Sequence, residues 1–153
     1  MLESKVTRLL ALYFKNTKEF LNMTIKKNLL IIGDVIAFAI LTVIGFATHG
    51  EVGTSFILRM GTTFFPLLLG WSLSATWLGL FDENITSEPK MLWRIFPAML
   101  LAAPLAVILR AVLLHSAAQP LFVLILGSMN AMGILVWRGC YLFIARGSGK
   151  LPG

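Results

Sequence analysis

The sequence predicts an all-α membrane protein: an antiparallel bundle of four transmembrane helices preceded by an amphipathic helix. Three observations carry this prediction. Hydrophobic residues make up 58% of the 153 residues and charged residues only 13%, whereas a soluble domain has about 25% charged residues. Four apolar stretches, 29–48, 60–81, 95–114 and 121–144, each have the roughly 20 residues that a helix needs to cross a hydrocarbon core. Lysine and arginine gather on one side of these stretches.

The four apolar stretches are expected to be helical because lipid cannot satisfy backbone N–H and C=O groups. The alternation with period two that marks a membrane barrel is absent from the sequence. The connections are short: 49–59 contains two glycines, 82–94 is polar and 115–120 has six residues. Such short connections predict that successive helices run antiparallel.

The orientation of the bundle is predicted from the lysines and arginines beside the spans. Six lie in the amino-terminal segment and four more on the same side, in the second connection and the tail 145–153. The opposite side has only Arg59, while Arg110 and Arg138 lie inside spans. We therefore expect both chain ends in the cytoplasm, with a bacterial plasma membrane or a thylakoid as the host. Trp77, Trp93, Trp137 and Tyr141 would form an aromatic belt at the cytoplasmic boundary.

Residues 1–28 predict a basic amphipathic helix and a linker. Apolar residues recur at helical spacing from Leu2 to Leu21, and Lys5, Arg8, Lys15 and Lys18 occupy much of the remaining circumference. This pattern favours a helix lying on a leaflet of anionic headgroups. The alternative is a helix that docks on a partner or on the bundle itself.

Several function classes find no support in the sequence. The net charge of +6 comes from residues that flank apolar runs, so it favours lipid headgroups over nucleic acid. The one cysteine, Cys140, excludes an intrachain disulfide. Zinc-protease, phosphate-loop, dinucleotide and nucleophile-elbow motifs are missing. We therefore expect no enzyme activity, no cofactor and no metal.

Two ionisable residues inside spans lie at matching depth. Asp34 is five residues into the first span and Arg138 is six residues from the end of the fourth, which places both roughly 7 to 9 Å from the cytoplasmic face. An unpaired charge in lipid is costly, so we expect the two side chains to face the interior and to pair. A structural bridge or a snorkelling arginine is favoured over a gate or an ion-coupling site.

A second group of polar residues lies toward the opposite face: His49, Glu51, Arg59, Arg110 and His115. Guanidinium groups bind carboxylate and phosphate bidentately, so these residues could form a ligand site. Binding of lipid headgroups explains them equally well. Two histidines alone are a weak signal for a metal or a haem.

Two polar residues fall near the middle of spans, Trp71 in the second and Asn130 in the fourth. Each needs a hydrogen-bond partner in lipid, and Asn130 is expected to join two helices. Small residues spaced by four predict close helix packing: Gly33 and Ala37, Gly70 and Ser74, Ala98, Ala102 and Ala106, and Gly127 and Ala131.

These residues resemble the DUF3054 family of four-helix membrane proteins, whose function is unknown. The resemblance covers about Gly33 to Arg138. Its carriers are Gly33-Asp34, Gly45 with Thr48-His49-Gly50-Glu51, Pro66 through Gly70-Trp71, Arg110, Gln119 and Trp137-Arg138. The chain departs from the family at the exit of the first span, where Phe46-Ala47 follow Gly45 in place of an arginine. The resemblance implies four spans and no particular activity.

Two functional hypotheses follow. In the first, which we favour, the bundle binds or transports a small anionic solute or a lipid, and a transporter this small would need to form a homodimer. In the second, the protein is an accessory subunit or assembly factor of a larger membrane complex. Few internal polar residues favour the second hypothesis, and the clustered outer charges favour the first.

Overall fold

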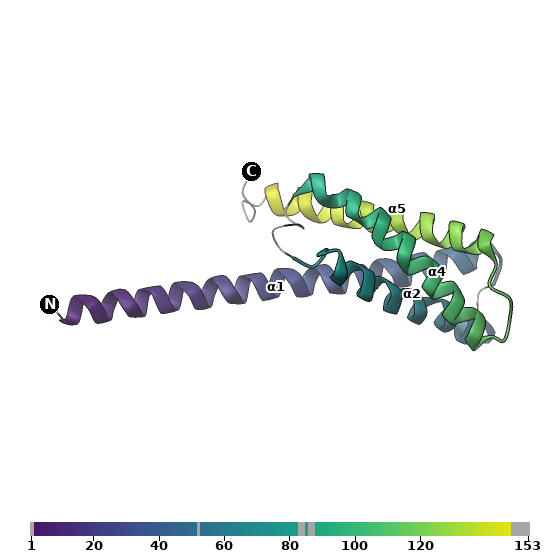
Figure 1. Cartoon of the computed structure of the whole chain (residues 1–153), viewed down its shortest axis with the longest axis horizontal. Helices are drawn as coiled ribbons and strands as arrows, with labels where there is room; N and C mark the ends of the chain where they lie inside the picture. The colour runs from purple at the N-terminus through teal and green to yellow at the C-terminus, as the bar shows by residue number, and fades with distance from the viewer. Residues whose placement is uncertain (1, 52, 83–84, 86–87, 148–153) are drawn as a thin grey trace.

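The computed structural model describes the backbone of residues 2–51, 53–82, 85 and 88–147, and the side chains of 12–18, 21, 26–51, 53–82, 85 and 88–146. Regular structure in these residues is helical. The long helices are α1 (Leu2–Thr48), α2 (Ile57–Trp77), α4 (Ile95–Leu113) and α5 (Pro120–Gly147), with short 3₁₀ helices η1 (Thr54–Phe56) and η2 (Pro89–Arg94) (Figure 1).

Four of these segments are long and apolar enough to cross a membrane, as the sequence predicts. They are Lys26–Thr48, Thr54–Trp77, Pro89–Leu113 and Pro120–Arg146. The first and third end within a residue of the predicted limits, and the fourth continues two residues further. The second and third spans both begin six residues earlier than predicted, and the second differs most because it also ends at Trp77 instead of residue 81.

The early end of α2 is caused by a turn at Gly79. This residue has a φ of 71°, in the left-handed region that glycine adopts without steric penalty. The N–H of Leu80 donates to the Ala75 carbonyl at 2.8 Å, and the N–H of Gly79 donates to the Thr76 carbonyl at 3.1 Å. These bonds satisfy carbonyls that the helix leaves free at its end. Leu78, Leu80 and Phe81 are apolar, so hydropathy alone extended the predicted span through the turn.

The first helix is longer than predicted. We expected a helix to about residue 21, a linker to residue 28 and a span from residue 29, but α1 is one helix of 47 residues. Its amino-terminal half projects beyond the other three helices (Figure 1). At 1.5 Å per residue the helix is about 70 Å long, more than twice the roughly 30 Å of a hydrocarbon core. To lie on the leaflet the projecting half would have to bend, and that orientation remains a prediction. The side chains of residues 1–11, 19–20 and 22–25, which carry much of the predicted amphipathic face, are outside the described part.

The four long helices pack side by side as a ring. α2 contacts α4, α4 contacts α5, α5 contacts α1 and α1 contacts α2. Gly70 brings α2 against α4 so closely that a Cβ atom there would lie 2.8 Å from the Ala102 carbonyl oxygen. Ala98, Ala102 and Ala106 are all buried on α4. The small-residue spacing seen in the sequence therefore marks the face along which these two helices approach.

The interior of the ring is a packed apolar core. Its largest buried side chains include Phe38, Leu67, Trp71, Met99 and Ile134. The ring of Phe38 meets the Trp71 indole edge-on, with centroids 5.6 Å apart. Large apolar side chains also cover the outer faces of the spans, as expected where the surrounding solvent is lipid. The core and the outer faces leave only a few places for polar chemistry.

Candidate functional site

A buried ion pair joins α1 to α5. The Arg138 guanidinium donates from Nε to Asp34 Oδ1 at 3.1 Å and from Nη2 to Asp34 Oδ2 at 2.6 Å. Asp34 is 1% exposed and Arg138 is 2% exposed. The two parallel bonds form the fork that favours arginine for carboxylate recognition. The structure thus brings together the two charges that the sequence places at matching depth.

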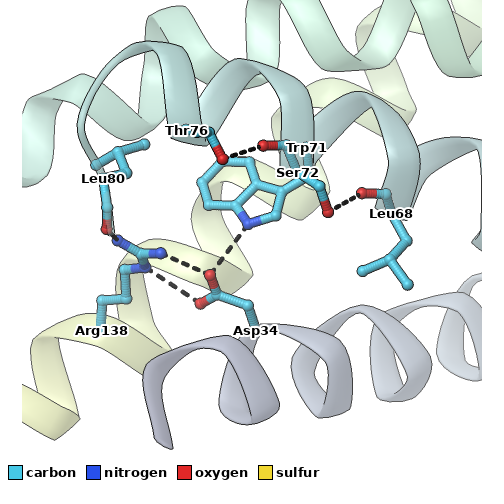
Figure 2. A network of polar contacts seen from close by, with 7 residues as sticks. All are labelled: Asp34, Leu68, Trp71, Ser72, Thr76, Leu80 and Arg138. Carbon is cyan, nitrogen blue, oxygen red and sulfur yellow. Dashed lines mark hydrogen bonds and ion pairs between the residues drawn. The ribbon is translucent and has the colours of Figure 1, made fainter. Parts of the chain in front are cut away.

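The pair has two further partners on the α2 side, and Figure 2 shows the whole network. The indole Nε1 of Trp71 donates to Asp34 Oδ2 at 3.0 Å. The Nη1 of Arg138 donates to the Leu80 carbonyl at 2.7 Å. The turn at Gly79 directs that carbonyl toward the pair. The carboxylate therefore accepts three bonds, and both charges are held by three segments of the chain.

Aromatic rings complete the surroundings of Arg138. Its Cζ lies 5.5 Å from the centroid of the Trp71 ring and 5.5 Å from that of Phe81. Such contacts stabilise a desolvated guanidinium. Nearby, the hydroxyls of Ser72 and Thr76 donate to carbonyls of their own helix, one turn back (Figure 2), and so do not take part in the network.

The residue that precedes each member of the ion pair also makes a contact, because Gly33 lies against Trp137. A Cβ atom at Gly33 would overlap the indole of Trp137, so only a glycine lets this ring pack against α1. Two consecutive residues of α1 therefore contact two consecutive residues of α5: Gly33 packs against Trp137, and Asp34 pairs with Arg138. The sequence suggested the second of these contacts and gave no sign of the first.

The two polar residues predicted near the middle of spans have different outcomes. Trp71 is not separate from the ion pair, because its partner is Asp34. Asn130 donates from Nδ2 to the Leu126 carbonyl at 2.7 Å, on its own helix, instead of joining two helices as we expected. Its Oδ1 is buried and has no hydrogen-bond partner among the described residues.

A pocket of about 560 Å³ lies at the other end of the bundle. Side chains of α2, α4, α5 and the connection between α4 and α5 line it: Arg59, Val107, Arg110, Ala111, Leu114, Ser116, Ala117, Gln119 and Phe122. It combines two guanidinium groups with a hydroxyl, an amide and an apolar wall. This composition suits a small ligand with a negative charge.

Arg110 is held in the pocket by two contacts, one with Thr63 and one with Phe122. Its Nε donates to the Thr63 hydroxyl at 3.0 Å, and that hydroxyl donates to the Arg59 carbonyl at 3.1 Å. Its Cζ lies 4.9 Å from the centroid of the Phe122 ring. No hydrogen bond joins its two terminal nitrogens to the described residues, so the outer edge of the guanidinium is available to a ligand.

Arg59 forms the charged rim of the pocket. Its Nη1 lies 3.1 Å from Glu51 Oε1, and the two side chains are 47% and 33% exposed. Glu51 reaches this position from the connection between α1 and α2. The predicted group of Glu51, Arg59 and Arg110 is therefore gathered at one end of the bundle.

The two histidines of the predicted group do not line the pocket. His49 and His115 are both exposed, and the described residues contain no group of three or more side chains that could hold a metal ion. His115 has a φ of 48° and follows the last turn of α4, where the Ser116 N–H donates to the Ala111 carbonyl at 2.9 Å. Histidine is enriched among the non-glycine residues that adopt this conformation, so His115 occupies a helix-ending turn.

Sequence reasoning identified only Arg59 and Arg110 among the lining residues of the pocket. It missed the others, of which Ser116, Gln119 and Phe122 carry polar or aromatic groups, and it missed Thr63, which binds Arg110. Thr63 had a usable signal, since it lies four residues after Arg59 and therefore on the same face of α2. Ser116, Gln119 and Phe122 come from the α4–α5 connection and the first turn of α5, whose path the sequence does not specify.

Together these observations define a helical membrane protein with four span-like helices, a buried ion pair at one end and a cationic pocket at the other. The chain belongs to the DUF3054 family, described as proteins of unknown function, whose family model matches residues 31–141. No curated protein and no solved structure matches the chain. The match includes both sites and leaves out the projecting half of α1.

Proposed function

We propose that this protein binds a small anion, either a free carboxylate or phosphate or the headgroup of a lipid, in the pocket around Arg110. One observation carries the proposal: a guanidinium fixed by Thr63 and Phe122 presents its unbonded edge to a cavity that a second arginine also lines. Guanidinium groups recognise carboxylate and phosphate through paired N–H donors. In this proposal the protein is a binding protein and not an enzyme.

We further propose that the bundle is antiparallel, that both chain ends are cytoplasmic and that the pocket opens on the opposite side. The distribution of lysine and arginine supports this orientation. Trp77 and Trp93 lie near the predicted cytoplasmic boundary and are 79% and 60% exposed, which fits an aromatic belt in contact with headgroups.

The apolar lining of the pocket supports a ligand with an organic part. Val107, Leu114 and Phe122 form an apolar wall beside the charged edge, as in sites that bind the organic part of a small ligand. Ser116 and Gln119 supply further donors that can orient it. The packed core between this pocket and the Asp34–Arg138 pair favours binding over passage through a single bundle. A transport role would require a second copy or a rearrangement of the helices.

The proposal is tested by titrating the detergent-purified protein with inorganic phosphate, with acetate and with a short-chain phosphatidylglycerol, using calorimetry. Arg110→Ala should reduce the affinity for the binding anion at least tenfold, since a charged hydrogen-bond pair contributes about 1.5–3 kcal/mol. Lys90→Ala, an exposed cation in the other connection, is the control and should leave the affinity unchanged. Preference for the lipid over both free anions identifies a headgroup site, and the reverse identifies a solute site. Equal affinities of the Arg110→Ala and unsubstituted proteins would refute the proposal.

The projecting half of α1 favours a second candidate, an accessory subunit of a larger membrane complex. Leu12, Tyr13, Phe14 and Leu21 are all more than half exposed there, beyond the part of α1 that packs on the bundle (Figure 1). A partner protein would bury this surface. Purification in mild detergent followed by native mass spectrometry separates the two candidates. A stoichiometric complex that is lost when residues 2–21 are deleted supports the subunit role, and a retained anion lost on Arg110→Ala supports ligand binding.

A further inference from the structure

Glu51 places a negative charge beside a pocket that is otherwise positive. Its carboxylate lies 3.1 Å from Arg59 Nη1, and Arg59 lines the pocket. Both side chains are substantially exposed. An ion pair in such a position is weak and exchanges readily with other partners. Glu51 therefore neutralises the positive charge of Arg59 only in part.

The net charge of Glu51, Arg59 and Arg110 taken together is small. Arg59 and Arg110 both line the pocket, and the carboxylate of Glu51 lies 3.1 Å from Arg59 Nη1. Two guanidinium groups and one carboxylate sum to a single positive charge. One bound monoanion makes the site neutral, whereas a dianion leaves an excess negative charge beside an apolar wall, where charge is poorly solvated.

We propose, on the basis of the proposed anion-binding function, that Glu51 restricts the pocket to monoanions. Glu51 acts as an internal anion that competes with the ligand for Arg59 and repels a second negative charge. The ligand class is then a carboxylate or a phosphodiester, each with one negative charge, in preference to a sulfate or a phosphate monoester. Glu51 is a specificity-determining residue that need not contact the ligand itself.

The test compares two sulfur oxyanions of different charge, methanesulfonate and sulfate, at one pH and one ionic strength. The unsubstituted protein is expected to bind methanesulfonate more tightly than sulfate. Glu51→Gln should raise the affinity for sulfate by about tenfold, because it removes a nearby like charge in a medium of reduced dielectric, and should raise the affinity for methanesulfonate by only a few-fold. Calorimetry in detergent measures both.

Glu88→Gln is the matched control, because it makes the same change at an exposed residue of the other connection and should alter neither affinity. A Glu51→Gln protein whose preference between the two anions equals that of the unsubstituted protein would overturn the assignment of Glu51 while leaving anion binding intact. Failure of both proteins to bind either anion, together with failure to bind acetate, phosphate and phosphatidylglycerol, would overturn the proposed function itself. Sulfate binding to Glu51→Gln that survives Arg110→Ala would show a surface ion outside the pocket, and would also reject the proposal.

Discussion

Arg138 of α5 and Asp34 of α1 are joined by two hydrogen bonds, of 3.1 and 2.6 Å, although 104 positions separate them in the chain. Both side chains are almost completely buried. A buried pair does not by itself stabilise a protein strongly, because desolvation opposes the attraction, but removing one partner leaves a charge without compensation. The pair is therefore best understood as a constraint on how α1 and α5 associate.

The first prediction concerns this pair. Asp34→Asn and Arg138→Gln should each lower the free energy of unfolding by about 3–5 kcal/mol. The double variant should be less destabilised than the sum, because neither charge is left alone. Unfolding in mixed micelles with increasing denaturing detergent measures all three. Additive losses would show that the two side chains do not interact.

The second prediction concerns the indole that completes the network. Trp71→Phe keeps an aromatic ring in the core but removes the donor to Asp34, and should lower the free energy of unfolding by about 1.5–3 kcal/mol, the usual contribution of a bond to a charged group. Trp77→Phe is the control, since Trp77 is 79% exposed. In an Asp34→Asn background the effect of Trp71→Phe should shrink. An undiminished effect there would mean that Trp71 acts through packing alone.

The third prediction compares two glycines. Gly33→Ala should destabilise the protein by about 1–3 kcal/mol, as expected for overpacking, because the new methyl group would overlap Trp137. Gly139→Ala should be neutral or stabilising by up to about 1 kcal/mol, since alanine is the better helix former and the added Cβ meets nothing within 4 Å. Thermal unfolding monitored by tryptophan fluorescence ranks the two variants. The opposite order would contradict the close approach of α1 and α5.

The fourth prediction concerns the end of α4. His115 has a positive φ, a conformation that costs a residue with a side chain about 1–2 kcal/mol and glycine nearly nothing. His115→Gly should therefore raise the unfolding temperature without reducing anion binding, measured by thermal unfolding and calorimetry on the same preparation. A loss of binding would instead make this histidine a ligand, in conflict with its place outside the pocket lining.

The sequence allowed the general plan to be predicted because hydropathy and helical rise are regular quantities. The four spans follow from apolar length, and the Asp34–Arg138 contact follows from equal depth measured along two helices. Contacts between a side chain and the backbone could not be predicted from hydropathy and helical rise. The Leu80 carbonyl reaches Arg138 only because Gly79 turns the chain, and hydropathy does not register a turn among apolar residues.

The cationic pocket was predicted only in part, for a related reason. Arg59 and Arg110 could be assigned to one end of the bundle from their positions along the spans. The arrangement of the two arginines depends on the Thr63 hydroxyl and the Phe122 ring, which lie on different helices. The sequence has several other threonines and phenylalanines in its spans, and nothing in it distinguishes these two. His49 and His115 lie at the same end of the bundle, but equal depth along the helices does not bring side chains into contact, and neither histidine lines the pocket.

The double contact between Gly33-Asp34 and Trp137-Arg138 fixes the register of two helices. If α1 slid along α5 by a single residue, the indole would meet a side chain and the guanidinium would lose its carboxylate at the same step. Rotation of α1 about its axis is opposed by the same two contacts. Since α1 continues as one helix from this contact to Leu2, the direction of its projecting half relative to α5 is set by the same two contacts.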